Sequence, residues 1–426
     1  MEIALWMALA FGFYMAWSIG ANDAANAMGT SVGSKAVSFR EAVIIAAIFE
    51  FLGALLAGGG VADTMRKGIV DPMLFQDLAL FPAGNGYEYF VWGMMASLIS
   101  AALWIHIAAF LGWPVSTTHS IVGAIAGFGV VSVGADNVEW MKLATIALSW
   151  LTSPVIGGIL AFAVFTVIRK FILDADDANR GIRIWAPVLS TPAFTTMWLI
   201  LFFKGLKSRH ELFATWGFDA KAMMILSVVL GVVSAITLGL FLRKTVIPEG
   251  ATSEQRYAVV ENVFRYLQVI TACFVAFAHG SNDVANSIGP VSAIVTTIDH
   301  MGITAKAAIP TWVLVLGAVG IVIGLASYGY RVIETIGTKI TEITPTRGFA
   351  AEFGAAATIL IGSNLGIPLS TTHTVVGAVI GVGFARGMNA LNLKIILNIV
   401  KSWIYTIPFT AVLTIILYSL FTAIFI

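Results

Sequence analysis

The chain alternates between long apolar stretches and short joints that carry charges, glycine or proline. A helix needs about 20 apolar residues to cross the hydrocarbon core of a bilayer, where its backbone groups must be paired internally. Twelve such stretches follow one another, at residues 3–29, 41–61, 88–111, 114–132, 141–168, 186–203, 221–242, 262–289, 305–330, 349–366, 368–385 and 393–425. The sequence therefore predicts an all-α polytopic membrane protein with about 12 transmembrane segments.

The composition excludes several classes of protein. Only 11% of the 426 residues are charged, whereas a soluble domain carries about 25%. The net charge of +1 provides no basic surface for nucleic acid. The chain has a single cysteine, no cysteine and histidine cluster with metal-ligand spacing, and no phosphate-binding loop of the nucleotide type. We therefore expect no cofactor, no nucleic-acid partner and no ATP-driven transport.

Two motifs occur twice, which divides the chain. Residues 21–29 match residues 281–289 at 5 of 9 positions, and residues 112–127 match residues 366–381 at 10 of 16. The repeat units are 1–168 and 262–426, and the connecting segment 169–261 holds two further helices. Seven segments precede the second unit, so it enters the membrane inverted. If the third and fourth segments of each unit form a re-entrant hairpin that does not cross the membrane, the number of crossings before the second unit is still odd. Inverted repeats with interrupted helices are typical of secondary transporters.

The distribution of lysine and arginine predicts the orientation. Joints after odd-numbered segments hold 14 of these residues, and joints after even-numbered segments hold 8. Because cytoplasmic loops carry the excess, we expect the odd joints in the cytoplasm and both termini outside.

The first repeated motif places Asp23 and Asp283 near the end of an apolar helix, where an ionised carboxylate costs at least a few kcal/mol without a partner. Carboxylate and amide oxygens suit a small hard cation, and we expect a sodium site here. The alternative is a helix cap, because Asx residues before small residues often end helices. The predicted sodium ligands are Asn22, Asp23, Asn26, Asn282, Asp283 and Asn286.

The second motif follows Pro114 and Pro368, which suit the first turn of a helix. Hydroxyls and unpaired N–H groups at a helix start form a ready anion site. We expect each motif at the tip of a hairpin that dips into the membrane; ordinary caps and interhelical hydrogen bonds are the alternative. The predicted anion ligands are Ser116, Thr117, Thr118, Ser370, Thr371 and Thr372. His119 and His373 are expected to contact backbone carbonyls, and a contact with the anion is the alternative.

Two more carboxylates lie in apolar surroundings. Glu50 and Glu352 are candidates for coupling ion movement to transport, because intramembrane acids are usually functional. A position of Glu352 close to the membrane interface is the alternative.

The two motifs together resemble the signatures of the inorganic phosphate transporter (PiT) family. The resemblance rests on residues 20–27, residues 279–286, both Pro-x-Ser-Thr-Thr-His sequences, Glu50 and Glu352, and it covers both repeat units. It implies symport of inorganic phosphate with sodium or protons, two inverted five-helix repeats, and a homodimer in the cell membrane. Some members of the family move sulfate instead.

Charge supports symport independently of the resemblance. A phosphate anion beside Asp23 and Asp283 brings a formal charge of about −3 or −4 into a low-dielectric site, where like charges repel by several kcal/mol. The motifs contain no arginine to balance it, so two or more cations must bind together with the anion. Sodium is favoured and proton binding is the alternative. An anion channel and a membrane hydrolase fit less well, since a channel needs no cation cage and no nucleophile–base pair stands out.

Overall fold

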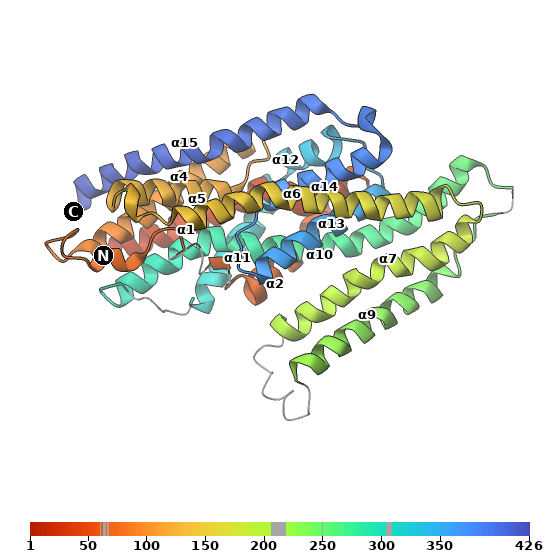
Figure 1. Cartoon of the computed structure of the whole chain (residues 1–426), viewed down its shortest axis with the longest axis horizontal. Coiled ribbons are helices and arrows are strands. Elements are labelled where there is room, and N and C mark those ends of the chain that lie inside the picture. Colours follow the sequence, from red (N-terminus) through yellow and green to blue (C-terminus); the bar gives the residue numbers. More distant parts are fainter. Residues whose placement is uncertain (60, 63–64, 66–67, 206–218, 249, 304–308) are drawn as a thin grey trace.

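The structure, a computed structural model, describes the chain apart from residues 60, 63–64, 66–67, 206–218, 249 and 304–308. Each of the twelve predicted apolar stretches contains a helix (Figure 1). Residue 60 and residues 305–308, at the edges of two predicted stretches, lie outside the described residues. The helices are α1 (Glu2–Gly33), α2 (Phe39–Ala57), α4 (Gly86–Phe110), α5 (Thr117–Ser132), α6 (Trp140–Ile168), α7 (Ala178–Ile200), α9 (Ala220–Leu242), α10 (Ser253–Asp299), α11 (Thr311–Tyr328), α13 (Pro345–Asn364), α14 (Thr371–Arg386) and α15 (Leu393–Phe425), with a short α12 (Tyr330–Glu334).

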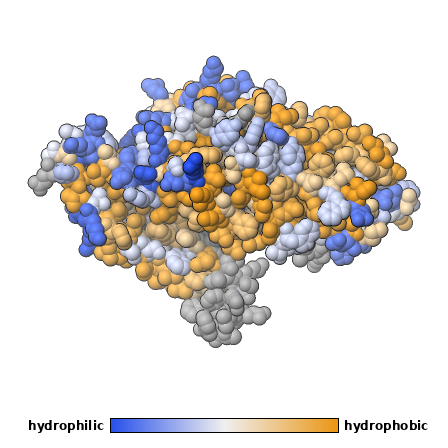
Figure 2. All heavy atoms as spheres, turned by 180° about the vertical axis from the view of Figure 1, so that it is seen from behind, coloured by the Kyte–Doolittle hydropathy of each residue, from blue (hydrophilic) through white to orange (hydrophobic). Residues whose placement is uncertain are grey.

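The described residues contain no β-strand, which confirms the predicted all-α fold class. Eight of the described helices are long and apolar enough to cross a membrane. Hydrophobic residues predominate on the face drawn in Figure 2, interrupted by hydrophilic patches. A large apolar surface of this kind needs lipid rather than water around it. The chain is therefore a multi-pass membrane protein.

Helices α1 and α10 form the centre of the bundle and run antiparallel. The hydroxyl of Ser287 donates to the carbonyl of Gly12 at 2.9 Å, while Ser34, at the other end of α1, donates to Gln268 at 2.7 Å. Helix α2 crosses α10 at Gly53, where an added Cβ would lie 2.1 Å from the carbonyl of Phe277. Helix α11 crosses α1 in the same way at Gly324. Small residues thus bring the four backbones into direct contact.

Two hairpins face this centre. Helices α4 and α5 join through Gly112, and α13 and α14 join through Gly366, whose φ angles of +68° and +69° favour glycine. The serine of each repeated motif then caps the returning helix: Ser116 accepts from the N–H of His119, and Ser370 from that of His373. The prediction that the second motif opens a helix is confirmed.

The periphery consists of long helices and one separate pair. Helix α14 packs on α6, where Gly158 faces Gly381, and α5 packs on α15, where Gly127 faces Ala411. Helices α7 and α9 pack closely on each other and project from one side of the bundle in Figure 1, with Ala193 of α7 packed against Phe274 of α10. Both termini lie at the same end of the molecule.

The sequence prediction was wrong about where the Asn-Asp motifs lie within their helices. Asp23 is ten residues from the end of α1 at Gly33, and Asp283 lies well inside the 47-residue α10. The residues that follow each motif keep helical geometry, including Pro290 in α10. Both motifs therefore present side chains from unbroken helices, and the helix-cap interpretation does not hold.

Candidate functional site

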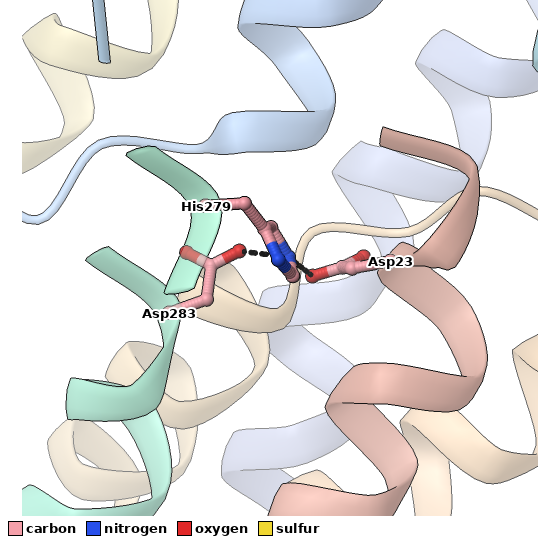
Figure 3. A group of neighbouring side chains, drawn as sticks. All are labelled: Asp23, His279 and Asp283. Carbon is pink, nitrogen blue, oxygen red and sulfur yellow. Dashed lines mark ion pairs between the residues drawn. The ribbon is translucent and has the colours of Figure 1, made fainter. Parts of the chain in front are cut away.

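Asp23, His279 and Asp283 form a buried cluster where α1 and α10 cross (Figure 3). Nε2 of His279 lies 2.9 Å from Oδ2 of Asp283 and 3.6 Å from Oδ2 of Asp23. All three side chains are inaccessible to solvent. Carboxylates from the two repeated motifs thus share one imidazole.

The hairpins add hydroxyl groups to these carboxylates. Thr117 donates to Oδ2 of Asp23 at 2.9 Å, and Thr371 donates to Oδ2 of Asp283 at 2.6 Å. Each aspartate is therefore held by the first threonine of the hairpin in its own half of the chain. The equivalence of the two contacts follows from the sequence repeat, because the same residue types occupy the same positions.

The second threonines cross from one half to the other. Thr118 donates to the carbonyl of Leu369 at 3.0 Å, and Thr372 donates to that of Val115 at 3.1 Å. These bonds join the two hairpin tips directly. The structure therefore brings together the predicted residues of all four motif copies, although Asp23 and Thr372, for example, are 349 positions apart in the chain.

The four asparagines of the motifs form two pairs that differ in the groups they contact. Asn22 and Asn282 bind the hairpin turns: the amide of Asn22 donates to the carbonyl of Trp113, and that of Asn282 donates to the carbonyl of Leu369, both at 2.9 Å. Their amide oxygens also have partners, which are the N–H of Val115 and the hydroxyl of Ser363. This pair fixes the position of the tips.

Asn26 and Asn286 instead reach across to the opposite hairpin. Asn26 donates to Thr372 at 2.8 Å, and Asn286 donates to Thr118 at 3.2 Å. The Oδ1 atoms of both asparagines are buried and have no hydrogen-bond partner within the described part of the chain. Buried polar atoms are normally satisfied, so two equivalent unpaired oxygens beside two carboxylates are a feature that a bound cation would explain.

The two motif histidines lie behind the hairpin tips. Nδ1 of His373 is 3.1 Å from the carbonyl of Trp150, which confirms the expected backbone contact for this residue. The ring of His119 packs on Trp150 and on His373, with centroids 3.7 Å and 4.3 Å apart. Aromatic packing holds His119, whose ring nitrogens have no hydrogen-bond partner in the described part of the chain, so the backbone contact expected for His119 is not found.

Glu50 faces the cluster from α2, with Oε1 3.1 Å from Nδ1 of His279. The imidazole therefore lies between Glu50 on one side and the two aspartates on the other. Sequence reasoning missed His279 as a site residue. The sequence feature that indicates this role is the spacing of His279 and Asp283, because residues four positions apart lie on the same face of a helix. Its contact with Glu50 depends on the packing of α2 against α10 and is invisible in the sequence.

Glu352 has a separate and well-satisfied environment. Oε1 accepts from Thr30 at 2.7 Å, from Ser31 at 2.5 Å and from Gln268 at 2.9 Å, and Oε2 accepts from Thr271 at 2.6 Å. The side chain is only 2% exposed, so Glu352 is buried inside the protein. Neutral donors from α1 and α10 surround this carboxylate, one turn of α1 beyond Asn26.

The chain is similar to proteins of one family over almost its whole length. Residues 19–414 match the family described as the phosphate transporter family, which is nearly the whole chain. The chain belongs to the phosphate transporter family. This membership confirms the resemblance noted in the sequence and makes the chain a phosphate transporter rather than an enzyme.

Individual members of the phosphate transporter family are similar along their length. A candidate phosphate permease of Pyrococcus abyssi is 44% identical over 99% of this chain and 98% of its own. The chloroplastic inorganic phosphate transporter 2-1 of Arabidopsis thaliana is 43% identical over 98% of this chain and 72% of its own. A solved structure described as the sodium-dependent phosphate transporter has a TM-score of 0.86 and 38% identity, with 99% of this chain and 100% of that one covered.

Proposed function

We propose that the chain is a sodium-coupled symporter of inorganic phosphate. The single observation that carries this proposal is the meeting of two buried aspartates, two unpaired amide oxygens and the threonines of two hairpin tips. Among the described residues, His279 is the basic side chain that lies within ion-pair distance of these aspartates. An anion bound here adds to the negative charge, so cations must bind with it. The solved structure with 38% identity is described as sodium-dependent, which supports sodium as the cation.

Sodium ions occupy the space beside Asp23 and Asp283 in this proposal. Carboxylate, amide and hydroxyl oxygens are the ligands that a small hard cation prefers. Asn26 and Asn286 supply amide oxygens directly, because their Oδ1 atoms are buried and unpaired. Asn22 and Asn282, also predicted as ligands, support the site by holding the hairpin turns.

Phosphate binds between the hairpin tips, at the N-terminal ends of α5 and α14. Helix N-termini and hydroxyl donors both favour an anion. Thr117, Thr118, Thr371 and Thr372 turn their hydroxyls from their present partners to the phosphate oxygens. Ser116 and Ser370 contribute mainly as caps, since each side chain accepts the N–H three residues later.

Proton coupling is the second candidate, and one observation favours it. His279 lies between Glu50 and the two aspartates, so a proton exchanged at its ring would change the charge of the site by one. In a sodium-coupled cycle the same residue separates the two aspartates when cations have left. We propose that Glu352 helps the cations leave. The hydroxyl groups that bind its carboxylate begin at Thr30, one turn of α1 beyond Asn26.

The architecture proposed for this function has two inverted repeats, 1–168 and 262–426, around the connecting segment 169–261. The antiparallel course of α1 and α10 and the equivalent contacts of Gly53 and Gly324 support the inversion. The hairpins α4–α5 and α13–α14 are re-entrant in this arrangement. We further propose a homodimer in the cell membrane with both termini outside.

Uptake into proteoliposomes tests the proposal directly. Purified protein is reconstituted, and labelled phosphate or sulfate is offered with an imposed sodium gradient, an imposed proton gradient or neither. We expect concentrative uptake of phosphate with the sodium gradient. Uptake driven by the proton gradient alone would show that protons, and not sodium ions, are coupled to transport. Preferential uptake of sulfate would overturn the substrate assignment.

A further inference from the structure

A cavity of about 390 Å³ lies between α2, α7 and α10, outside the site described above. Its walls are entirely carbon and sulfur side chains, among them Phe49, Met197, Cys273, Phe274 and Phe277. Cys273 and Phe274 occupy the middle of the apolar stretch 262–289, which places the cavity at the depth of the hydrocarbon core. Water has no hydrogen-bond partner on such walls, so a polar occupant is disfavoured.

The cavity opens onto the outer surface of the bundle. Its rim contains Leu52, Met197 and Leu201, which are 38%, 47% and 40% exposed. These side chains come from α2, α7 and the turn after α7, and they continue the lipid-facing surface of the spanning helices. Whatever enters therefore comes from the membrane.

The chemistry of the walls favours a hydrocarbon chain over a peptide. An extended peptide would leave unpaired backbone groups in hydrocarbon. A hydrocarbon chain needs no hydrogen bonds, and the volume lies in the range of small-molecule sites.

We propose that this cavity binds the acyl chain of a membrane lipid. The back wall of the site is the contact between α2 and α10, where the backbones touch at Gly53 and Phe277 and again at Glu50 and Gly280. Phe49 and Phe277 line the cavity, and they lie one and two residues from Glu50 and His279. A bound chain supports this contact from outside, so lipid occupancy stabilises the arrangement that holds Glu50 against His279.

Photocrosslinking tests the site with the full-length protein. Delipidated protein in detergent is titrated with phosphatidylcholine that carries a diazirine in one acyl chain, and crosslinked residues are mapped by mass spectrometry. We expect crosslinks at Cys273, Phe274 and Met197 that saturate as the probe concentration rises. The outer face of α9, represented by the half-exposed Val229, should show a linear rise instead, because it meets only the lipid dispersed in the micelle.

Two variants fill the cavity or leave it open. Leu52→Trp places an indole at the rim and should abolish the saturable crosslinks, whereas Val229→Trp on α9 should preserve them. Lipid added to delipidated protein should also raise the Tm of the parent more than that of Leu52→Trp. If Leu52→Trp fails to fold, Cys273→Phe fills the same space from α10. A linear rise at Cys273, unchanged crosslinking in the folded filling variants, or crosslinks to a second copy would each overturn the proposal.

Discussion

At the residue scale, the two halves of the site use the same side chains for the same contacts. The first threonine of each hairpin holds the aspartate of its own half, and the second donates to the opposite tip. One exception is His279, which pairs with Glu50 and both aspartates. One imidazole therefore breaks the equivalence of the two halves at the point where charge matters most.

Replacing threonine by valine at 117, 118, 371 or 372 removes one hydroxyl and keeps the branched shape. A lost hydrogen bond to a charged group costs about 1.5–3 kcal/mol. At about 1.4 kcal/mol per factor of ten, phosphate should bind roughly ten- to a hundredfold more weakly in at least one variant of each half. Direct binding of labelled phosphate at saturating sodium measures this. Thr→Ser at the same position is the control and should be milder. Parent-like affinity in all four valine variants would place the anion elsewhere.

His279→Gln should destabilise the folded protein, because it leaves three buried carboxylates without their basic neighbour. Breaking a buried ion pair by removing one partner typically costs about 3–5 kcal/mol. Thermal unfolding in detergent checks the effect as a lower Tm. Adding Glu50→Gln to the same chain removes one of the stranded charges and should recover part of the loss. If the Tm of the double variant falls by the sum of the decreases in the two single variants, Glu50 and His279 are not coupled.

At the element scale, much of the architecture was predictable and part of it was not. The apolar stretches predicted the twelve long helices but not the short α12, and the duplicated Pro-x-Ser-Thr-Thr-His sequence predicted the two hairpin tips, because these features are local. The unbroken course of α1 and α10 was not predictable, since the small residues around Asn22 and Asn282 suit a helix as well as a break. The Glu50–His279 contact depends on the crossing of α2 and α10, which appears only when the helices pack.

Close helix crossings also make a prediction at this scale. A Cβ at Gly20 would lie 1.9 Å from the carbonyl of Ile321, whereas a Cβ at Gly59 would meet nothing within 4 Å. Gly20→Ala should therefore push α11 away from α1 and lower the Tm. Gly59→Ala should leave the Tm close to that of the parent, because the added methyl group meets nothing within 4 Å. Equal Tm values for Gly20→Ala and the parent would contradict the tight crossing of α1 and α11.

At the scale of the whole molecule, the chain joins a polar centre to an apolar exterior. The buried acids lie on or between the central helices, while the peripheral helices present large apolar side chains. Both termini lie at one end of the bundle, as an even number of crossings requires. The excess of lysine and arginine in the odd joints predicts that this end faces outside.

Single cysteines near residues 2 and 425 test this orientation. They are introduced separately into a Cys273→Ala background, which removes the native thiol. An impermeant thiol reagent should label both positions in intact cells. Labelling only after the cells are opened would reverse the orientation, and labelling of one terminus alone would refute an even number of crossings.

The most direct test of sodium coupling is the phosphate affinity of the purified protein as a function of sodium concentration. Choline replaces sodium at constant ionic strength and pH, and Asp283→Asn is measured beside the parent. If cations and anion require each other, the phosphate Kd of the parent must fall as sodium rises, and by reciprocity phosphate must tighten sodium binding. Asp283→Asn should weaken this dependence. A phosphate Kd that is the same in choline and in sodium would contradict the account.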